Sequence, residues 1–278
     1  MKFSKMHGLG NDFIVFSGMS DDPDRDYSAL ARSLCDRRLG IGADGMIVAV
    51  TSTTAAIRMR FYNGDGSEAS MCGNGIRCFA KYVYEQGIVP QTSFAIETPA
   101  GIMRPELNLA GEKVESVKVN MGQPGLERSR IPMVGPAGQV INEPLTVGDH
   151  TFNVTSLLMG VPHTMIFTED LDQVDLLNLG PQLENHPSFP KRTNVNWVQV
   201  INDHEIKVRT WERGAGSTLA CGTGSCAAVV AGVLNGRIGR KTIVHLALGD
   251  LLIEWAPDEL VYMTGPAVEV FVGEMALS

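Results

Sequence analysis

Short apolar runs separated by glycine-rich turns recur along the chain, and they predict a protein built mainly of β-strands. Some runs alternate apolar with polar positions, as at Ile57, Met59 and Phe61, which is typical of a strand with one buried face. The first half has predicted strands at 3–6, 13–16, 46–50, 57–62, 94–97, 101–103 and 114–121. The second half has them at 152–159, 164–167, 194–201, 205–211, 243–246, 251–255, 261–264 and 268–272.

Helical spacing is found in only a few places. One helix is predicted from residue 27, with Asp26 as its cap, and short helical turns are predicted within 171–184. Two further helices begin directly after Cys72 and Cys221 and run to about residues 86 and 235. Because these two are apolar over much of their surface, we expect each to lie inside a sheet. So few helices disfavour a doubly wound parallel sheet.

The two cysteine segments resemble each other. Cys72 is followed by Gly-Asn-Gly and Cys221 by Gly-Thr-Gly, and a polar residue stands nine positions before each, Asn63 in one case and Glu212 in the other. The cysteines are 149 positions apart (221 − 72), about half of the chain. We therefore predict two similar domains, at 1–121 and 122–264, with the Gly- and Pro-rich stretch 122–144 as a linker.

Composition is compatible with this division. The chain has 278 residues, which suggests two domains at about 150 residues each, and its net charge is −8 (23 − 31). An acidic balance argues against nucleic acid or an anionic membrane as a partner. There is no apolar run near the roughly 20 residues of a membrane span and no signal peptide at the start. We expect a cytoplasmic protein whose five cysteines are reduced thiols.

The cysteine segments suggest acid–base chemistry. A cysteine at the first turn of a helix lies near unpaired amides and the positive end of the helix dipole, which favour the thiolate. A Gly-polar-Gly loop lets backbone N–H groups approach a carboxylate. Two such sites would hold one carboxylate and place two cysteines on opposite faces of the adjacent carbon. One thiolate could then remove a proton while the other thiol returns one, which inverts the stereocentre without a cofactor.

Other interpretations of the cysteines remain open on the residues alone. Buried cysteines are usually inert, and we interpret Cys35, Cys78 and Cys226 in this way. A zinc site is disfavoured because the cysteine pairs lack knuckle spacing, so no metal is expected. A redox centre would need C-x-x-C, which is absent, and a papain-like pair with His163 would leave one cysteine without a role. No lysine stands in a context that suggests pyridoxal phosphate.

Taken together, the segments resemble the diaminopimelate epimerase family over essentially the whole chain. The first contains Asn63-Gly-Asp-Gly-Ser, four residues, then Cys72-Gly-Asn-Gly-Ile-Arg, which fits the family signature. The second, from Glu212-Arg-Gly-Ala-Gly to Cys221-Gly-Thr-Gly, is equally characteristic. The resemblance implies a PLP-independent isomerase that converts LL- to meso-diaminopimelate, in lysine and peptidoglycan precursor synthesis. It also implies an α+β fold of two domains, each a mixed, mainly antiparallel, barrel-like sheet around a central helix.

The resemblance implies residue roles as well. Cys72 and Cys221 would be the acid–base pair, with His163 and Glu212 supporting their protonation states. Substrate-binding residues would be Asn11, Asn63, Gly73, Asn74, Asn194, Glu212, Arg213, Gly222 and Thr223. The last strand, at about 265–278, would return to the first domain, the site would lie in the cleft between the domains, and the enzyme would be a homodimer.

Gly45, Val161 and Phe271 differ from the best-known family pattern, in which a glutamine, an asparagine and a tyrosine stand at these places. The loss of an amide at Val161 keeps open a second hypothesis, another cofactor-independent racemase on the same scaffold, for example one acting on histidine. A non-catalytic amino-acid binding protein is a third, which would tolerate serine in place of either cysteine.

Overall fold

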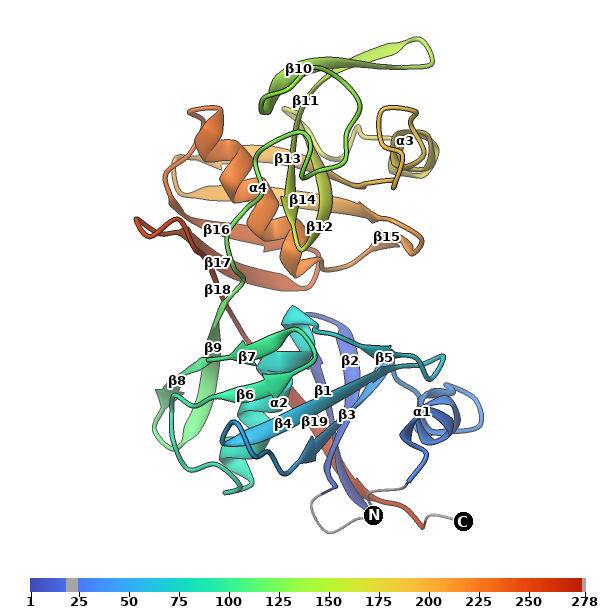
Figure 1. Cartoon of the computed structure of the whole chain (residues 1–278), viewed down its shortest axis with the longest axis vertical. Coiled ribbons are helices and arrows are strands. Elements are labelled where there is room, and N and C mark those ends of the chain that lie inside the picture. Colours follow the sequence, from blue (N-terminus) through green and yellow to red (C-terminus); the bar gives the residue numbers. More distant parts are fainter. Residues whose placement is uncertain (19–24, 277–278) are drawn as a thin grey trace. The chain divides into compact units, whose positions relative to one another are not determined.

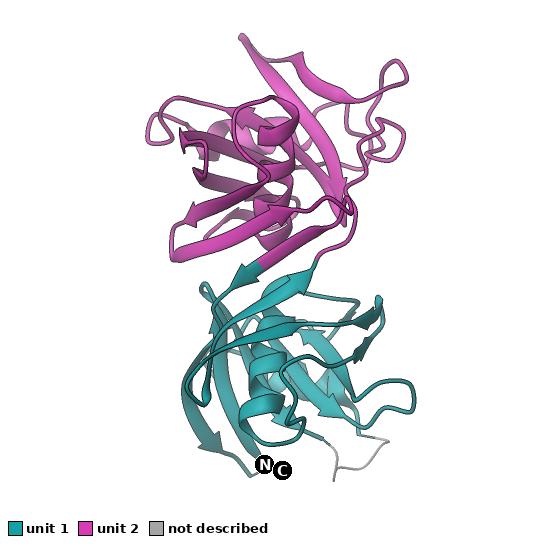
Figure 2. Ribbon diagram, turned by 90° about the vertical axis from the view of Figure 1, so that its left-hand side faces the viewer, with its two compact units in different colours: residues 1–120, 264–278 teal, residues 121–263 magenta. Residues whose placement is uncertain are grey.

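The computed structural model describes residues 1–18 and 25–276, and the chain divides into two compact units (Figure 2). Unit 1 comprises Met1–Asn120 together with Thr264–Ser278, and unit 2 comprises Met121–Met263. Residues 277–278, part of the segment expected to return to the first domain, lie outside the described residues.

Unit 1 contains a mixed, mainly antiparallel sheet whose strands are connected in the order β19-β1-β2-β3-β4-β6-β7, with β5 paired to β4 (Figure 1). β2 pairs with β3, and β4 with β6, in parallel; the remaining pairs on this path are antiparallel. The strands are β1 (Lys2–Gly8), β2 (Asn11–Ser17), β3 (Gly45–Val50), β4 (Ile57–Asn63), β5 (Glu68–Ala69), β6 (Ile96–Thr98), β7 (Gly101–Met103) and β19 (Val268–Glu274). The strands β8 (Glu106–Ala110) and β9 (Lys113–Asn120) form an antiparallel hairpin.

Unit 2 contains strands in the order β10-β11-β12-β13-β14-β16-β17-β18, with β15 paired to β14. Here β12 pairs with β13, and β14 with β16, in parallel. The strands are β10 (Val140–Val147), β11 (His150–Met159), β12 (Val161–Phe167), β13 (Asn194–Asn202), β14 (Glu205–Glu212), β15 (Gly216–Thr218), β16 (Lys241–Leu246), β17 (Gly249–Trp255) and β18 (Val261–Gly265).

The two units repeat one connection pattern. Each has a hairpin, a helical crossover to a parallel strand, a second hairpin and a second crossover. The crossover helices of unit 1 are α1 (Tyr27–Cys35) and α2 (Gly73–Glu85), and those of unit 2 are α3 (Leu176–Glu184) and α4 (Gly222–Leu234). Parallel neighbours require such crossovers, which explains why every helix in the described residues lies between strands that pair in parallel.

The two helices of each unit pack on opposite faces of its sheet, because successive side chains of a strand point to alternate faces. In β2, Ile14 and Phe16 pack with Tyr27, Ala31 and Leu34 of α1. The preceding residue, Phe13, points to the other face, where a Cβ on Gly75 of α2 would lie 3.6 Å from its ring. Ten of the thirteen residues of α2 are buried, so this helix occupies the interior that the strands curve around (Figure 1).

Unit 2 uses the same alternation. Val195 and Trp197 of β13 belong to the core that includes Leu176 and Leu183 of α3. Asn196 faces the other way, toward the first turn of α4. α4 is apolar around its circumference yet spans only 13 residues. In the residues that the structure describes, no helix has both the length and the apolar character needed to cross a membrane.

The expected fold class is confirmed: two sheet-rich halves with few helices, each half built around a central helix. The sheet of unit 1 has free ends at β19 and β7 among the described strands, so it is curved rather than a closed barrel. The cap Asp26 is also confirmed, since its carboxylate accepts the Ala29 N–H at 2.9 Å. The helices after the two cysteines end at the predicted places, with caps at Gln86 and Asn235.

Four details were wrong. The stretch 122–144 is not simply a linker, because β10 begins at Val140 and the buried Ile131 packs into the core of unit 2. The strands β5, β8, β10 and β15 were missed. α3 is one continuous helix rather than separate turns. The strand predicted at 164–167 begins earlier, at Val161, so that His163 lies within β12 and pairs in register with Asn194.

Candidate functional site

The two cysteines occupy matching positions, each at the N-cap of a central helix. Cys72 Sγ accepts a hydrogen bond from the Gly75 N–H, and Cys221 Sγ accepts one from the Gly224 N–H, both at 3.4 Å. Serine, threonine or a carboxamide normally occupies an N-cap, so cysteine at both caps indicates a chemical role. The donated N–H and the helix dipole both favour the thiolate form.

A short hairpin explains the nine-residue spacing before each cysteine. β4 ends at Asn63, β5 turns back along it, and the chain then reaches Cys72. β14 ends at Glu212, β15 turns back along it, and the chain then reaches Cys221. The repeated sequence pattern is therefore a repeated path of the backbone into the helix.

The surroundings of Cys72 include an oriented amide. Asn11 Oδ1 accepts from Cys72 Sγ at 3.6 Å and from Asn74 Nδ2 at 3.3 Å. Asn11 Nδ2 donates to Asp44 Oδ2 at 2.8 Å. Because a carboxylate can only accept, Asp44 fixes the direction of the amide and turns its oxygen toward the sulfur.

Asp44 is itself part of an ion cluster. Arg37 Nη2 lies 2.8 Å from Asp44 Oδ1 and 2.7 Å from Asp12 Oδ1, and Lys5 Nζ lies 2.7 Å from Asp12 Oδ2. Burial of Asp12 opposes ionisation, but hydrogen bonds from Arg37 and Lys5 outweigh it and hold the pKa of this carboxyl well below its usual range. The Asp44 carboxylate that orients Asn11 is thus itself paired with the Arg37 guanidinium.

Cys221 is more enclosed than Cys72, with 5% of its surface exposed. Its sulfur lies 3.6 Å from Thr223 Oγ1, and it also contacts the Glu212 carboxylate, which accepts from Thr218 Oγ1 at 2.6 Å. Burial first, and the Glu212 charge second, raise the pKa of the Cys221 thiol. The resting form of Cys221 is therefore the thiol, with a carboxylate beside it.

His163 is fully buried on β12. Its Nδ1 lies 3.2 Å from Asn196 Nδ2. Burial, and then the positive charge of Arg213, lower the pKa of His163 to about 3. The imidazole is therefore neutral at physiological pH.

The loop at 212–214 is held by three contacts. The Arg213 N–H donates to Asn194 Oδ1 at 2.7 Å, and the guanidinium donates from Nη1 to the Lys191 carbonyl at 2.8 Å. The buried Glu184 accepts from the Gly214 N–H at 3.0 Å and from the Trp211 indole at 2.7 Å. These contacts hold the backbone on both sides of Glu212.

The predicted residues are divided between the two units. Unit 1 holds Asn11, Asn63, Cys72, Gly73 and Asn74, and unit 2 holds His163, Asn194, Glu212, Arg213, Cys221, Gly222 and Thr223. Asn63 is engaged locally, since its Nδ2 donates to Ser67 Oγ at 2.9 Å. Sequence reasoning missed the residues that support the groups, namely Asp44, Glu184, Asn196 and Thr218. Nothing in their local sequence marks them, because their partners are distant along the chain or lie across a short hairpin.

The remaining cysteines have the inert surroundings expected of them. Within the described residues all five cysteines are free thiols. Burial raises the pKa of Cys35 to about 11 and that of Cys78 to about 12. Among the described residues, no cluster of three or more His, Cys, Asp or Glu side chains is arranged to hold a metal.

Gly45 has no room for a side chain. A Cβ at this position would lie 2.5 Å from the Phe61 ring and 2.8 Å from the Tyr62 carbonyl oxygen. The second of these is a backbone atom that cannot rotate away. Glycine at position 45 is therefore tied to the packing of β3 against β4.

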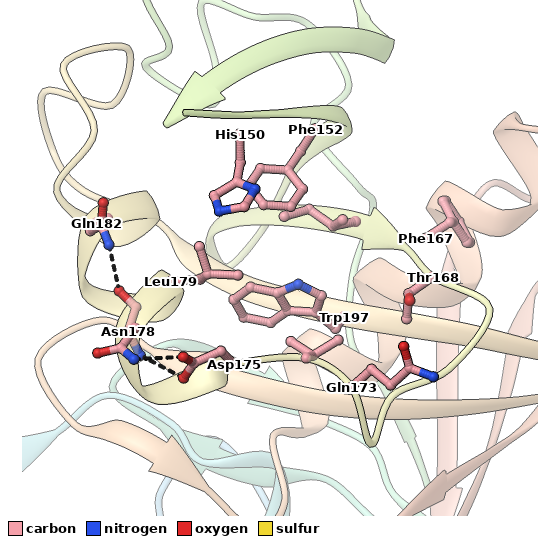
Figure 3. A pocket seen from close by; sticks show the side chains of 12 residues that line it. His150, Phe152, Phe167, Thr168, Gln173, Asp175, Asn178, Leu179, Gln182 and Trp197 are labelled. Atoms are coloured by element: carbon pink, nitrogen blue, oxygen red, sulfur yellow. Dashed lines mark hydrogen bonds between the residues drawn. The ribbon is translucent and has the colours of Figure 1, made fainter. Parts of the chain in front are cut away.

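A cavity of about 430 Å³ in unit 2 is separate from these groups (Figure 3). It lies on the α3 face of β13, with the Trp197 indole at its floor and His150 and Phe152 above it. Asn194 and Asn196 point to the opposite face of β13, and none of the predicted site residues lines the cavity.

Comparison with known proteins follows this geometry. The family model described as diaminopimelate epimerase matches residues 3–127 and 155–270. A diaminopimelate epimerase of Moorella thermoacetica is 54% identical over 278 residues, covering 100% of both chains. One from Pelotomaculum thermopropionicum is 54% identical, covering 99% of this chain and 98% of that protein. One from Methanococcus maripaludis is 46% identical, with 99% of each chain covered.

Solved structures at lower identity share the fold. A probable proline racemase from Agrobacterium radiobacter aligns with a TM-score of 0.70 at 15% identity, covering 100% of this chain and 93% of that one. A PhzF-family phenazine biosynthesis protein from Bacillus anthracis also aligns with a TM-score of 0.70 at 15% identity, covering 100% and 99%. At this identity the solved structures show only that the fold is shared, whereas the full-length relatives show the family. By the extent and identity of those matches, the chain belongs to the diaminopimelate epimerase family of isomerases.

Proposed function

We propose that the protein interconverts LL- and meso-diaminopimelate, with Cys72 and Cys221 acting on opposite faces of one α-carbon and with no cofactor. The observation that carries this proposal is the matched pair of N-cap cysteines, each 3.4 Å from the N–H three residues along its helix. Membership of the diaminopimelate epimerase family supplies the substrate.

The two cysteines have different surroundings, which suits an acid and a base. Cys221 is a buried thiol beside Glu212, whereas Cys72 is partly exposed. In one direction a thiolate takes the α-proton, the electron pair of the C–H bond moves onto the adjacent carboxylate, and the opposite thiol delivers its proton to the other face. The reverse reaction exchanges the two roles.

Backbone amides of the helix starts would hold the reacting carboxylate. Gly73 and Asn74 on one helix, and Gly222 and Thr223 on the other, present N–H groups that lack partners within the helix. These donors would also stabilise the charge that develops when the α-proton leaves. Asn11, held by Asp44, would lie at this end of the substrate.

The distal amino-acid end of the substrate would be bound by polar residues. Arg213 suits a carboxylate and Glu212 an ammonium group. Asn194, which already orients the Arg213 backbone, and Asn63 would complete this set. A substrate without a second amino-acid end would leave these groups unpaired, which favours diaminopimelate over histidine.

The proposal is tested by α-proton exchange in D₂O, followed by NMR. Wild-type protein, C72S and C221S are each incubated with LL- or meso-diaminopimelate under reducing conditions, without added pyridoxal phosphate. The wild type should introduce deuterium into the inverted product. Each serine variant should lose at least about 10²-fold in turnover, the usual contribution of a positioned acid or base.

C226A and C78A serve as matched controls. These cysteines lie deep in the same two helices and are fully buried, so their variants should retain turnover. Normal turnover in C72S or C221S would contradict the mechanism. Exchange with histidine but not with diaminopimelate would instead support another racemase on this scaffold.

We also propose that the protein is a homodimer formed through β19. This edge strand pairs with β1 on one side and exposes apolar residues on both faces, with exposed fractions of 42–59% at Val268, Val270, Phe271 and Val272. Exposed apolar edge strands are prone to pair with another chain. A second copy could continue the sheet by a two-fold symmetric contact.

A reducing compartment suits the proposed chemistry. The mechanism needs both catalytic cysteines as free thiols, and all five cysteines are free in the described residues. Such thiols persist in the cytoplasm, which is the location we propose.

A further inference from the structure

The buried amide of Asn196 connects His163 to Thr210. Asn196 Nδ2 lies 3.2 Å from His163 Nδ1 and 3.8 Å from Met165 Sδ, and Asn196 Oδ1 accepts from Thr210 Oγ1 at 3.0 Å. At most 2% of the surface of any of these four residues is exposed. Solvent therefore does not compete for these contacts.

The contacts fix the direction of the Asn196 amide. A thioether carries no proton, so Met165 Sδ can only accept a hydrogen bond and selects the NH₂ end. Thr210 donates its hydroxyl proton to the oxygen end. That oxygen also lies against the first turn of α4, where a Cβ on Gly224 would be 2.5 Å away. A reversed amide would place its oxygen against the sulfur.

The amide direction in turn fixes the tautomer of His163. Because Asn196 Nδ2 donates to Nδ1, Nδ1 carries a lone pair and the single proton of the neutral ring is on Nε2. The low pKa of the ring, about 3, agrees with a neutral imidazole. His163 Nε2 is buried and has no hydrogen-bond partner among the described residues.

A buried donor without a partner is unfavourable, and native proteins keep few of them. The unpaired donor here is the Nε2–H of His163. The partner of His163, Asn196, packs against Gly224, and the Gly224 N–H donates to the Cys221 sulfur. Asn196 thus connects the His163 ring to the helix turn whose N–H donates to the Cys221 sulfur. An anionic acceptor that appears during turnover would satisfy the Nε2 donor.

We propose that Asn196 is a positioning residue that keeps His163 as a neutral imidazole donating from Nε2 to an anionic acceptor, the substrate carboxylate or the Cys221 thiolate. This inference rests on the proposed function. His163 keeps its proton throughout: the α-proton passes to one cysteine, the opposite thiol supplies the returning proton, and the imidazole N–H stabilises the charge between these events. His163 is then an electrostatic donor and not a general base.

The tautomer is measured directly by long-range ¹H–¹⁵N NMR on the labelled full-length protein at pH 7, with the His163 signals assigned by comparison with H163Q. A protonated Nε2 and an unprotonated Nδ1 are expected. A ring protonated at Nδ1, or at both nitrogens, would overturn the proposal. This measurement needs no substrate, so it stands apart from whether the protein turns over diaminopimelate.

N196D tests the link to turnover, because a carboxylate only accepts and draws a proton onto Nδ1. The Nε2 donor is then lost, and kcat should fall by about 10²–10³-fold, the usual effect of removing one preorganised donor, with a smaller change in KM. An unchanged kcat with the Nδ1-protonated ring would contradict the proposal. If N196D gains a second ring proton and keeps the Nε2 donor, kcat should stay near wild type, and a large loss would contradict it.

M165L and T210V complete the set. M165L keeps the volume but removes the sulfur that selects the NH₂ end of Asn196, so the Nε2-protonated tautomer and kcat should both fall, by less than in N196D. T210V removes the donor to Asn196 Oδ1 and should give a mixture of tautomers, which keeps the test available if N196D does not fold.

The acceptor of the Nε2 proton is identified by adding meso-diaminopimelate to wild type and to C221A. A downfield shift of the Nε2 proton in both proteins indicates the substrate carboxylate. A shift seen only in wild type indicates the Cys221 thiolate. No shift in either protein would overturn the donor role.

Discussion

At the scale of single residues, glycines allow the cap cysteines to be close to their neighbours. Gly224 donates its N–H to Cys221 Sγ and leaves space for the Asn196 oxygen on its other side. Gly75 likewise donates its N–H to Cys72 Sγ. A Cβ added to Gly75 would have the Ile47 side chain as its nearest neighbour. The Gly-polar-Gly sequence therefore serves packing, in addition to the anion binding that we propose for it.

G224A should destabilise the protein and lower turnover. Alanine would gain up to about 1 kcal/mol of helix propensity. Its Cβ would lie 2.5 Å from Asn196 Oδ1, and overpacking of this kind usually costs about 1–3 kcal/mol. Urea unfolding and steady-state turnover measure the two effects. G75A should be milder, because its closest contact is the end of the Ile47 side chain at 3.2 Å; equal losses in both variants would argue against the clash.

Acid should weaken the fold through His163. The folded pKa is about 3 and the unfolded value about 6.5, so between these values the unfolded chain binds a proton that the folded chain excludes. Stability is unaffected above pH 6.5 and falls below it by up to about 1.4 kcal/mol per pH unit. From pH 6.5 to 4.5, wild type should lose about 2–3 kcal/mol more than H163Q in urea unfolding. H150Q, which removes an exposed histidine, should keep the wild-type slope.

At the scale of elements, β13 separates a face that packs on α3 from a face that carries candidate site residues. Trp197 and Val195 hold α3 on one face of β13, while Asn196 and Asn194 meet the site on the other. α3 also supplies Glu184, which holds Trp211 and Gly214 around the Glu212 loop. A helix outside the site therefore positions residues within it.

G180A tests this support from α3. A Cβ on Gly180 would lie 2.4 Å from Trp211 Cδ2, so the indole must move even though alanine favours the helix. We expect a loss of about 1–3 kcal/mol in stability, together with reduced turnover through the neighbouring Glu212. L177A, at an exposed position of the same helix, should leave both nearly unchanged. Wild-type turnover in G180A would show that the loop does not depend on Trp211.

At the scale of the whole molecule, two copies of one β-hairpin and helical-crossover plan carry the two cysteines. The return of residues 264–276 to unit 1 is tied down by Arg77, whose Nε donates to the Pro266 carbonyl at 3.1 Å while its Nη1 caps Gly73 O at 3.0 Å. The chain end therefore reinforces the start of α2, next to Cys72.

V270K should weaken the proposed dimer. A lysine on the edge strand β19 opposes strand pairing between copies, and Val270 has 56% of its surface exposed, so the folded monomer should tolerate the change. Sedimentation equilibrium should show a dimer for wild type and monomer for the variant at micromolar concentration. L177K, which places the same charge on α3, should remain dimeric. An unchanged mass for V270K would place the interface elsewhere.

Local sequence patterns were sufficient for much of this molecule. The Asp26 cap, the helix starts at the two cysteines and the alternating strands depend on neighbouring residues, so spacing along the chain is enough to find them. β10 was missed because it lies in a Gly- and Pro-rich segment and contains Pro144, which an edge strand tolerates since that position need not donate a hydrogen bond. β5 and β15 are too short to show a period.

Protonation and orientation in the site, by contrast, depend on residues that folding brings together. Asn196 is 33 positions from His163 and 14 from Thr210, Glu184 is 27 from Trp211, and Asp44 is 33 from Asn11. Whether a thiol or an imidazole is charged depends on burial and on these distant partners, because both act through space and leave no periodic trace in the chain. The amino-acid order thus indicates which groups are candidates for the chemistry, and the tertiary structure sets their protonation states.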